Sequence, residues 1–448
     1  MISFRKLLVF LILACFLVGC GSETSPTDPS EVPAKTVPAA PVDYAASLKL
    51  DLSSDTAKQE VTVKTFIDGD TVHFNVPTDV MSDGVLKARF LAVNTPESTG
   101  KIEEYGKTAS EFTRERLSAA ASILVESDNS GWNMDSTGDR HLVWVWYKTS
   151  EAGEYRNLNV EILQNGLARA NSASDNRYGS TCLSAVEQAR KLELNIYSGQ
   201  KDPNYYYGDA VELTLMELRT NIEAYSGMKV AFNGVITTNS GNQGVYVEDL
   251  DPESGYYCGM YLYYGHGLNG TGLDILSVGN EVRIVGTVQY YEGGGTWQVS
   301  DLNYRMMKPD DPGNIQKLSE GHSPSWVVID PDTFVNGEVV LQLDDADITM
   351  PYAQLALGTS VEMKGLHVLD IHTTDNEGSS SNGAMTLSCE SNDIPITVRT
   401  TLLLDETGNR ITADSYLGKT IDVKGIVDLF DGTYQIKVFT ANNITINE

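Results

Sequence analysis

Arg89 and Glu97 are residue types that can act on a phosphate group, and they stand at the two ends of one short run, Arg89-Phe90-Leu91-Ala92-Val93-Asn94-Thr95-Pro96-Glu97. A guanidinium can bind two phosphate oxygens at once, and a carboxylate can orient or deprotonate an attacking water. An ordinary strand end with a surface Arg and a surface Glu would have the same composition. The surrounding elements must therefore distinguish the two interpretations.

The run combines a strand with a turn. Phe90 and Ala92 belong to a β-rich segment, and Pro96 cannot donate to a ladder, so strand pairing should stop near Thr95. Residues 61–67 and 72–76 alternate in polarity and predict a hairpin whose Asp-Gly-Asp turn carries Asp70.

A further strand and three helices are expected downstream. The strand is Arg140–Trp146, with Leu142, Trp144 and Trp146 on one face by its period of two. Apolar stripes at helical spacing predict helices over Tyr105–Ala121, Asn157–Ala168 and Leu183–Tyr197. Strands first and helices interleaved later indicate a small β-barrel capped by helices.

Residues 59–200 resemble the staphylococcal nuclease, or thermonuclease-like, domain, and the match covers about a third of the chain. The matching pieces, in chain order, are Ile67-Asp68-Gly69-Asp70-Thr71, Arg89 through Thr95-Pro96-Glu97, Tyr105-Gly106 to Phe112-Thr113, Arg140-His141-Leu142, Asn165-Gly166-Leu167-Ala168, and Glu187 with Leu194-Asn195-Ile196-Tyr197. The resemblance implies a five-stranded OB-type barrel that hydrolyses phosphodiester bonds of DNA or RNA with Ca²⁺.

The resemblance also assigns roles to individual residues. It makes Asp70 a metal carboxylate, Thr95 a metal ligand through its backbone carbonyl, and Asn94 the occupant of a second metal-carboxylate position. Glu97 should orient or deprotonate the attacking water, while Arg89 and Arg140 should bind the phosphate. This set suits the chemistry, because calcium prefers oxygen ligands and guanidiniums can neutralise the developing phosphate charge.

Three features depart from the family pattern. Asn94 is neutral where the family has Asp, so calcium affinity should fall. Asn171-Ser172-Ala173-Ser174 stands where the family carries tyrosines that stack on the nucleotide, and Asp139 adds one residue before Arg140. A loop can absorb the extra Asp139, but Asn94, the missing tyrosines and the acidic second half of the chain motivate an alternative function, a noncatalytic cell-surface binding protein built of OB-like barrels.

The N-terminal part of the chain has the features of an export signal and a spacer. Arg5 and Lys6 precede the apolar run Leu7–Val18, which predicts a signal peptide over residues 1–20. Its end, Leu17-Val18-Gly19-Cys20, resembles a bacterial lipobox, which implies lipidation of Cys20 and a lipid anchor in the cell envelope, outside the cytoplasm. A simple secretory leader is the alternative. The Pro-, Ser- and Thr-rich composition that follows predicts a flexible tether, placed at residues 21–58.

The second half of the chain contains a repeat. Four segments share the spacing Gly-x-x-Val/Ile-x-x-x-Gly, and they begin at Gly227, Gly279, Gly358 and Gly418. The intervals of 52 and 60 residues within pairs, and of 131 and 139 between pairs, indicate two copies of one module. We expect two small antiparallel OB-like barrels, at residues 208–308 and 325–448, so the whole chain is predicted to be mainly β with helices.

The charge of this half argues against binding of nucleic acid. Residues 201–448 hold 13 Lys and Arg against 35 Asp and Glu, a formal net charge of −22. Its tyrosines, Tyr256, Tyr257, Tyr261, Tyr263, Tyr264, Tyr290 and Tyr291, suit either a stacking platform or ordinary strand packing. The partner of these barrels stays open. The three cysteines beyond the leader, Cys182, Cys258 and Cys389, have neither disulfide-framework nor metal-ligand spacing, so free buried thiols are expected, with a Cys258–Cys389 bridge as the alternative.

Overall fold

The computed structural model describes residues 40–99, 102–241, 243–342, 347–376, 379 and 381–447. The predicted signal peptide, Cys20 and the first half of the predicted tether, residues 21–39, lie outside these residues. Within the described part, no helix is both long enough and apolar enough to cross a membrane.

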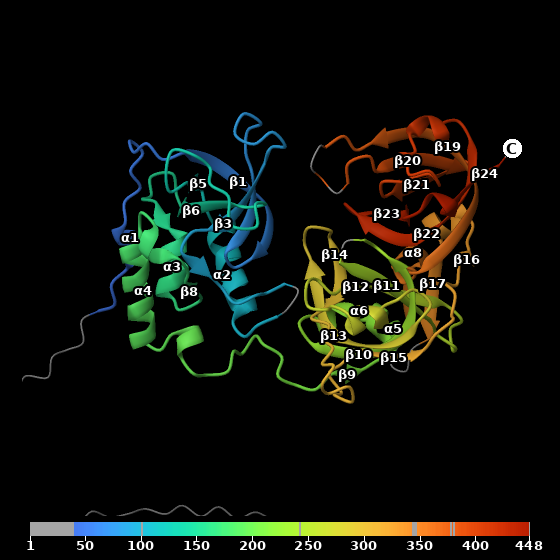
Figure 1. The fold of residues 1–448 in the computed structure, drawn as a ribbon, viewed down its shortest axis with the longest axis horizontal. Coiled ribbons are helices and arrows are strands. Elements are labelled where there is room, and N and C mark those ends of the chain that lie inside the picture. The colour runs from blue at the N-terminus through green and yellow to red at the C-terminus, as the bar shows by residue number, and fades with distance from the viewer. Residues whose placement is uncertain are drawn as a thin grey trace, which may run out of the picture. The chain divides into compact units, whose positions relative to one another are not determined.

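The first barrel is built from β1 (Lys58–Asp68), β2 (Thr71–Asn75), β3 (Val85–Phe90), β5 (Ser122–Glu126) and β6 (His141–Lys148). The antiparallel order β3-β2-β1-β5-β6 closes where β3 pairs with β6 in parallel, with Arg89 opposite Leu142 (Figure 1). This strand order is that of an OB-type barrel. The predicted hairpin is confirmed, with the Asp-Gly-Asp turn between β1 and β2.

One strand prediction for this barrel was incomplete. Leu142, Trp144 and Trp146 were expected to share one face of β6 by a period of two, but burial does not alternate: Val143, Trp144, Val145, Trp146 and Tyr147 are all buried, and Leu142 is partly buried. Both faces are covered, because the amide of Asn159 on α3 (Leu158–Gln164) binds the β6 backbone and Tyr178 contacts the rings of both tryptophans. Strands buried on both faces lose the period of two.

Three helices lie against the barrel, as expected. They are α2 (Gly106–Ser118), α3 and α4 (Gly179–Lys191), and α4 is followed by the 3₁₀ turn η2 (Asn195–Tyr197). Helices α3 and α4 lie side by side (Figure 1). The short elements between them are β4 (Val93–Asn94), β7 (Arg156–Asn157), β8 (Arg169–Ala170) and η1 (Ala173–Asp175).

The end of the predicted tether is folded. Residues 43–58 lie on the first barrel, where α1 (Tyr44–Ser47) buries Ala45 completely and Asp43 forms an ion pair with Arg156. The reason is composition, since Tyr44, Leu48 and Leu50 supply apolar surface that the Pro-rich stretch before them lacks.

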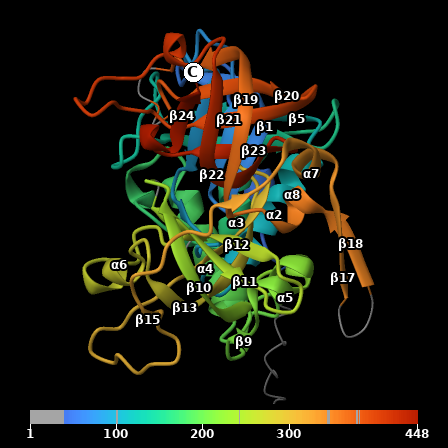
Figure 2. The same ribbon diagram turned by 90° about the vertical axis from the view of Figure 1, so that its right-hand side faces the viewer.

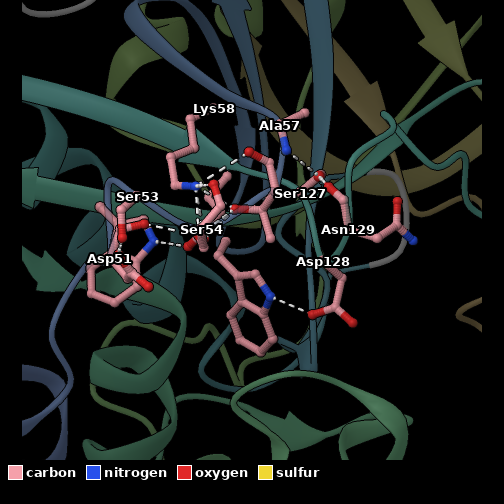
Figure 3. A network of polar contacts seen from close by, with 12 residues as sticks. Asp51, Ser53, Ser54, Ala57, Lys58, Ser127, Asp128 and Asn129 are labelled. Atoms are coloured by element: carbon pink, nitrogen blue, oxygen red, sulfur yellow. Dashed lines mark hydrogen bonds and ion pairs between the residues drawn. The ribbon is translucent and has the colours of Figure 1, made fainter.

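A polar network fixes this segment to the barrel. The ammonium of Lys58 donates to Oγ of Ser54 at 2.7 Å and to Oγ1 of Thr56 at 2.5 Å, and it lies 3.8 Å from the buried carboxylate of Glu126. Figure 3 shows Lys58 turned toward Ser54, with Ala57 bound to Asn129 beside them. Glu126 also accepts hydrogen bonds from Thr56 and Trp146. Every polar group of this buried cluster is thereby paired.

The second barrel consists of β10 (Lys229–Asn239), β11 (Gly244–Leu250), β12 (Tyr257–Tyr263), β13 (Glu281–Tyr291) and β14 (Thr296–Ser300). Its strand order is β13-β14-β12-β11-β10, it closes through β10–β13, and β12 runs parallel to β14. The flanking elements are β9 (Val211–Glu212), α5 (Leu215–Thr220), η3 (Ile222–Tyr225), α6 (Thr271–Ile275) and β15 (Gln316–Ser319).

The third barrel repeats this topology. It uses β19 (Ser360–Thr373), β20 (Met385–Ser391), β21 (Ile394–Thr400), β22 (Thr420–Phe430) and β23 (Thr433–Val438), with closure through β19–β22 and a parallel β21–β23 pair. The other elements are β16 (Val327–Val328), α7 (Pro331–Asn336), β17 (Glu338–Gln342), β18 (Asp347–Pro351), α8 (Tyr352–Leu355), η4 (Ala413–Ser415), η5 (Ala441–Asn443) and β24 (Ile444–Asn447). Strands β17 and β18 form a separate hairpin (Figure 2). Within the described residues the strands thus close into three five-stranded barrels, which confirms the predicted fold class.

The repeated glycines mark equivalent places in both copies. The first glycine of each segment has a positive φ, of 77° at Gly227, 88° at Gly279, 89° at Gly358 and 71° at Gly418, as a turn into a strand requires. The cysteine prediction is also confirmed, because Cys182, Cys258 and Cys389 are free and buried.

Candidate active site

Asp70 occupies a buried position at the turn between β1 and β2. The Asp70 side chain is hidden from solvent. Its Oδ2 accepts a hydrogen bond of 2.8 Å from the backbone N–H of Thr95, and its Oδ1 accepts one of 3.1 Å from Oγ1 of Thr71. Gly69 makes this approach possible, because a Cβ there would lie 2.8 Å from Cγ2 of Thr95. The Asp-Gly-Asp turn therefore holds Asp70 against the loop that follows β3.

Arg89 reaches Asp70 from the neighbouring strand. In the β2–β3 register Thr71 lies opposite Arg89, so the guanidinium extends over the turn. Nη1 of Arg89 forms an ion pair with Oδ1 of Asp70, and Nη2 donates a hydrogen bond of 2.7 Å to Oδ1 of Asn94. Arg89, Asp70 and Asn94 thus form one contact group, of which Asn94 is the solvent-exposed member.

Glu97 lies at the end of the same loop. Its position is set by Gly106 at the start of α2, where a Cβ would come within 2.1 Å of the carbonyl oxygen of Glu97. The N–H of Glu97 donates to Oε2 of Glu103 at 3.3 Å, and its carbonyl accepts from the N–H of Glu103 at 2.9 Å. Glu97 keeps contact with solvent beside the buried pair, although part of its carboxyl is withdrawn from water.

Negative charge exceeds positive charge at this site. Burial, together with the neighbouring Asp68, raises the pKa of Asp70 to about 7, although Arg89 opposes the shift. Burial and Glu97 raise the pKa of Asp68, and partial withdrawal of its carboxyl from water, together with Asp70, raises the pKa of Glu97. Three carboxylates therefore share the nearby cation of Arg89, and a further cation would stabilise their ionised forms.

Arg140 is brought to the same end of the barrel by the parallel β3–β6 pair, just before β6 begins. Asp135 fixes its side chain, since Oδ2 accepts from Nε at 2.8 Å and lies 2.7 Å from Nη2. Burial raises the pKa of Asp135, but hydrogen bonds from Thr137 and Arg140 outweigh it and lower that pKa overall. Burial raises the pKa of Glu97, and the positive charges of Arg89 and Arg140 oppose that shift.

Four of the six residues singled out from the sequence for this site are joined by direct contacts, Asp70 with Arg89 and Thr95, and Arg89 with Asn94. Glu97 follows in the same loop, and Arg140 is held by Asp135. The sequence interpretation gave no role to Asp68 and Asp135. Asp68 accepts a hydrogen bond of 3.1 Å from the N–H of Asp70. Its position in the Asp-Gly-Asp turn, two residues before Asp70, could have indicated that it belongs to the site. For Asp135 the sequence held no such signal, because its contact with Arg140 depends on the shape of the loop before β6.

The oxygen donors of Asp70, Asn94 and the Thr95 carbonyl suit a hard cation such as Ca²⁺. Asp70 and Asn94 are both bound to Arg89, however, and the described residues hold no group of three His, Cys, Asp or Glu side chains arranged for a metal. The donor chemistry and the shortage of positive charge fit a calcium ion, provided that Arg89 shifts away from Asp70.

The segment Asn171–Ser174 shows what replaces the family's tyrosines. It follows β8, which pairs with β4 and places Arg169 opposite Asn94. The N–H of Asn171 donates to the carbonyl of Ala92, and Ser172, which immediately precedes η1, has a positive φ of 48°. Small polar side chains thus border the site here, and they offer no ring for base stacking.

Part of the chain that forms this site matches a known protein family. Residues 87–199 match the family model described as staphylococcal nuclease homologue. The match includes Arg89, Asn94, Thr95, Glu97 and Arg140, while β1, β2 and Asp70 precede it. The chain therefore carries a domain similar to staphylococcal nuclease, built on an OB-type barrel and followed by two further barrels of the same topology.

Proposed function

We propose that this protein is a calcium-dependent endonuclease that hydrolyses phosphodiester bonds of DNA, RNA or both. The observation that carries the proposal is the convergence of Arg89, Asp70 and Glu97 on one end of the first barrel, with Arg140 close enough to influence Glu97. Two guanidiniums can neutralise the charge that develops on the phosphate oxygens, and a carboxylate of raised pKa can accept a proton from the attacking water.

The residues of this site divide the work of the reaction. Glu97 accepts a proton from the attacking water, whose oxygen bonds to phosphorus as the bond to the leaving sugar oxygen breaks. Arg89 and Arg140 bind the non-bridging oxygens and stabilise their developing charge. Arg89 can do so when it shifts away from Asp70, as calcium binding requires, because the N–H donors that now contact Asp70 and Asn94 then become available to the phosphate.

A Ca²⁺ ion held by Asp70, Asn94 and the Thr95 carbonyl would add positive charge beside the phosphate and neutralise the buried carboxylates. The carboxyls of Asp68 and Asp70 make the surroundings of this position polar. The hydrogen bond from the Thr95 N–H to Asp70 fixes Thr95 beside it. Because Asn94 contributes a neutral amide, we expect weaker calcium binding than a site with two carboxylates would give.

We further propose that the enzyme acts outside the cytoplasm, anchored in the bacterial cell envelope through a lipid on Cys20. The support is the sequence, in which the apolar run Leu7–Val18 ends in a lipobox-like Leu17-Val18-Gly19-Cys20. Metabolic labelling with a palmitate analogue tests this part, and a Cys20→Ala variant should lose both the label and the membrane fraction.

The nuclease proposal is tested by incubating purified protein with single-stranded DNA, double-stranded DNA and RNA in millimolar Ca²⁺ or in excess EGTA. We expect shortened products with calcium and intact polymers with EGTA. Binding of a polymer without cleavage, and without any effect of EGTA, would favour the alternative of a noncatalytic binding protein.

A further inference from the structure

The helix that packs against the Glu97 loop has no side-chain cap of its own. Helix α2 begins at Gly106, and its N-cap residue, Tyr105, makes no side-chain hydrogen bond to the N–H groups of the helix. Tyr105 also has a φ of 66°, a left-handed conformation that is strained for a residue with a large side chain. Such a conformation persists only where the surroundings hold it, so the contacts of Tyr105 identify what fixes the start of α2.

Those contacts come from residues 198–202, which follow the first barrel in the chain. Oδ2 of Asp202 accepts a hydrogen bond of 2.6 Å from the backbone N–H of Tyr105. The Tyr105 hydroxyl lies 3.1 Å from Oγ of Ser198 and donates to the carbonyl of Gln200 at 3.0 Å. The backbone and the ring of Tyr105 are therefore both held by one segment, which lies at least 93 residues further along the chain.

Asp202 is the centre of this segment. Only 2% of the residue is exposed, and its Oδ1 accepts hydrogen bonds from the N–H of Asn204 at 2.9 Å and from Oγ1 of Thr108 at 3.2 Å. Its own N–H donates to the hydroxyl of Tyr207 at 2.9 Å. A carboxylate that accepts from the backbone at the positive end of a helix does the work of a cap, and its hydrogen bonds are charge-assisted. Asp202 thus caps α2 from a distant part of the chain.

Helix α2 connects this cap to both halves of the active site. At its start, a Cβ on Gly106 would lie 2.1 Å from the carbonyl oxygen of Glu97, so the helix backbone is in direct contact with the Glu97 loop. Further along the helix, Oγ1 of Thr113 donates a hydrogen bond of 2.6 Å to the carbonyl of Gly69, which immediately precedes Asp70. The placement of α2 therefore sets where Glu97 lies relative to Asp70.

We propose that Asp202 is a positioning residue for the Glu97 base, acting through Tyr105 and the start of α2; this inference rests on the proposed nuclease function. Asp202 keeps Tyr105 in its left-handed conformation and so keeps the first turn of α2 against the Glu97 loop. A displacement of a reacting group by about 1 Å can lower a rate by about 100-fold. Asp202 lies beyond the residues that match the family model, which end at residue 199, so this support comes from the segment between the first and second barrels.

The kinetic test compares the unmodified full chain with Asp202→Ala, Asp202→Asn and Asp209→Ala on one single-stranded DNA oligonucleotide in calcium. Asp202→Ala removes the carboxylate that accepts these hydrogen bonds, so kcat should fall by about 10- to 100-fold while KM changes by less than about twofold. Asp202→Asn keeps one acceptor oxygen and should restore part of the lost kcat. Asp209, an exposed residue of the same connecting segment, loses the same charge in Asp209→Ala, and this control should keep full activity.

Hydrogen exchange measured by mass spectrometry gives a second readout that needs no catalysis. In Asp202→Ala the backbone N–H groups of residues 103–110 should exchange at least about tenfold faster, while those of β5 and β6 keep their rates. This readout separates two failures. If the unmodified protein cleaves no nucleic acid, the nuclease proposal fails, whereas equal exchange at the start of α2 in both proteins would overturn the role of Asp202 by itself.

An unchanged kcat in folded Asp202→Ala would overturn the positioning role. So would a raised KM at constant kcat, because Asp202 would then serve substrate binding. A lowered kcat without faster exchange at the start of α2 would also contradict the proposal, since the effect would not pass through the helix. Should Asp202→Ala fail to fold, as judged by circular dichroism, Asp202→Asn supplies both comparisons, with Asp209→Asn as its control.

Discussion

Oδ1 of Asn94 accepts a hydrogen bond of 2.7 Å from Nη2 of Arg89, the same guanidinium that forms an ion pair with Asp70. Asn94, which occupies the position of a second metal carboxylate, is thus bound to Arg89, which should bind the phosphate. This contact predicts how calcium binding responds when Asn94 is replaced by a charged aspartate.

We expect Asn94→Asp to tighten calcium binding by about tenfold, because a full negative charge within a few ångströms of a divalent ion outweighs the stronger attraction to Arg89. Isothermal titration calorimetry of the purified variant measures this affinity. Asn75→Asp, an exposed residue on β2, makes the same change in net charge and should leave the affinity unaltered. Equal affinities of Asn94→Asp and the unmodified protein would contradict the assignment of this position.

The pKa of about 7 for Asp70 predicts a pH dependence of stability in the absence of metal. The folded protein holds a proton on this carboxyl that the unfolded chain releases near pH 4, so the free energy of unfolding should fall as the pH rises from 4 to 7, by at most about 1.4 kcal/mol per pH unit. Urea titrations in EGTA at several pH values measure the slope. Asp70→Asn should reduce the slope, and an unchanged slope would refute the assignment.

Asp135 is expected to position Arg140 without contacting substrate. Asp135→Asn removes the charge that holds the guanidinium, so kcat/KM should drop by about tenfold while the free energy of unfolding changes little. Asp139→Asn is the control, because Asp139 pairs with Lys87 at the surface and its loss should matter little. Steady-state kinetics on one oligonucleotide compare the variants, and equal kcat/KM for Asp135→Asn would show that Arg140 needs no such support.

Lys58 should stabilise the first barrel rather than take part in the reaction. Its ammonium is largely buried between Ser54, Thr56 and the fully buried Glu126, so Lys58→Met leaves that carboxylate without its cation and should cost about 3 kcal/mol. Lys49→Met serves as control, because Lys49 and Glu154 are both well exposed. Denaturant unfolding gives both values, and a cost below about 1 kcal/mol for Lys58→Met would contradict the network.

Much of the fold follows from local patterns that survive folding. The Asp-Gly-Asp turn, the α2 stripe and the repeated glycines each depend on neighbouring residues, and the structure confirms them. Residues 43–58 and β6 were harder to predict because their burial depends on distant partners such as Arg156 and Tyr178. For the site, motif residues indicated Asp70, Arg89, Glu97 and Arg140, but the contact between Arg89 and Asn94 required three-dimensional coordinates.

Glu97 carries the central claim, because only a base beside the phosphate distinguishes a nuclease from a binding barrel. The most direct measurement is the release of acid-soluble nucleotides from single-stranded DNA in calcium by the unmodified protein, by Glu97→Gln and by Glu115→Gln, a control at a well-exposed residue of α2. We predict that Glu97→Gln lowers kcat by about 10²- to 10⁴-fold, while Glu115→Gln retains full activity. Full activity of Glu97→Gln, or no calcium-dependent release by the unmodified protein, would contradict the proposed mechanism.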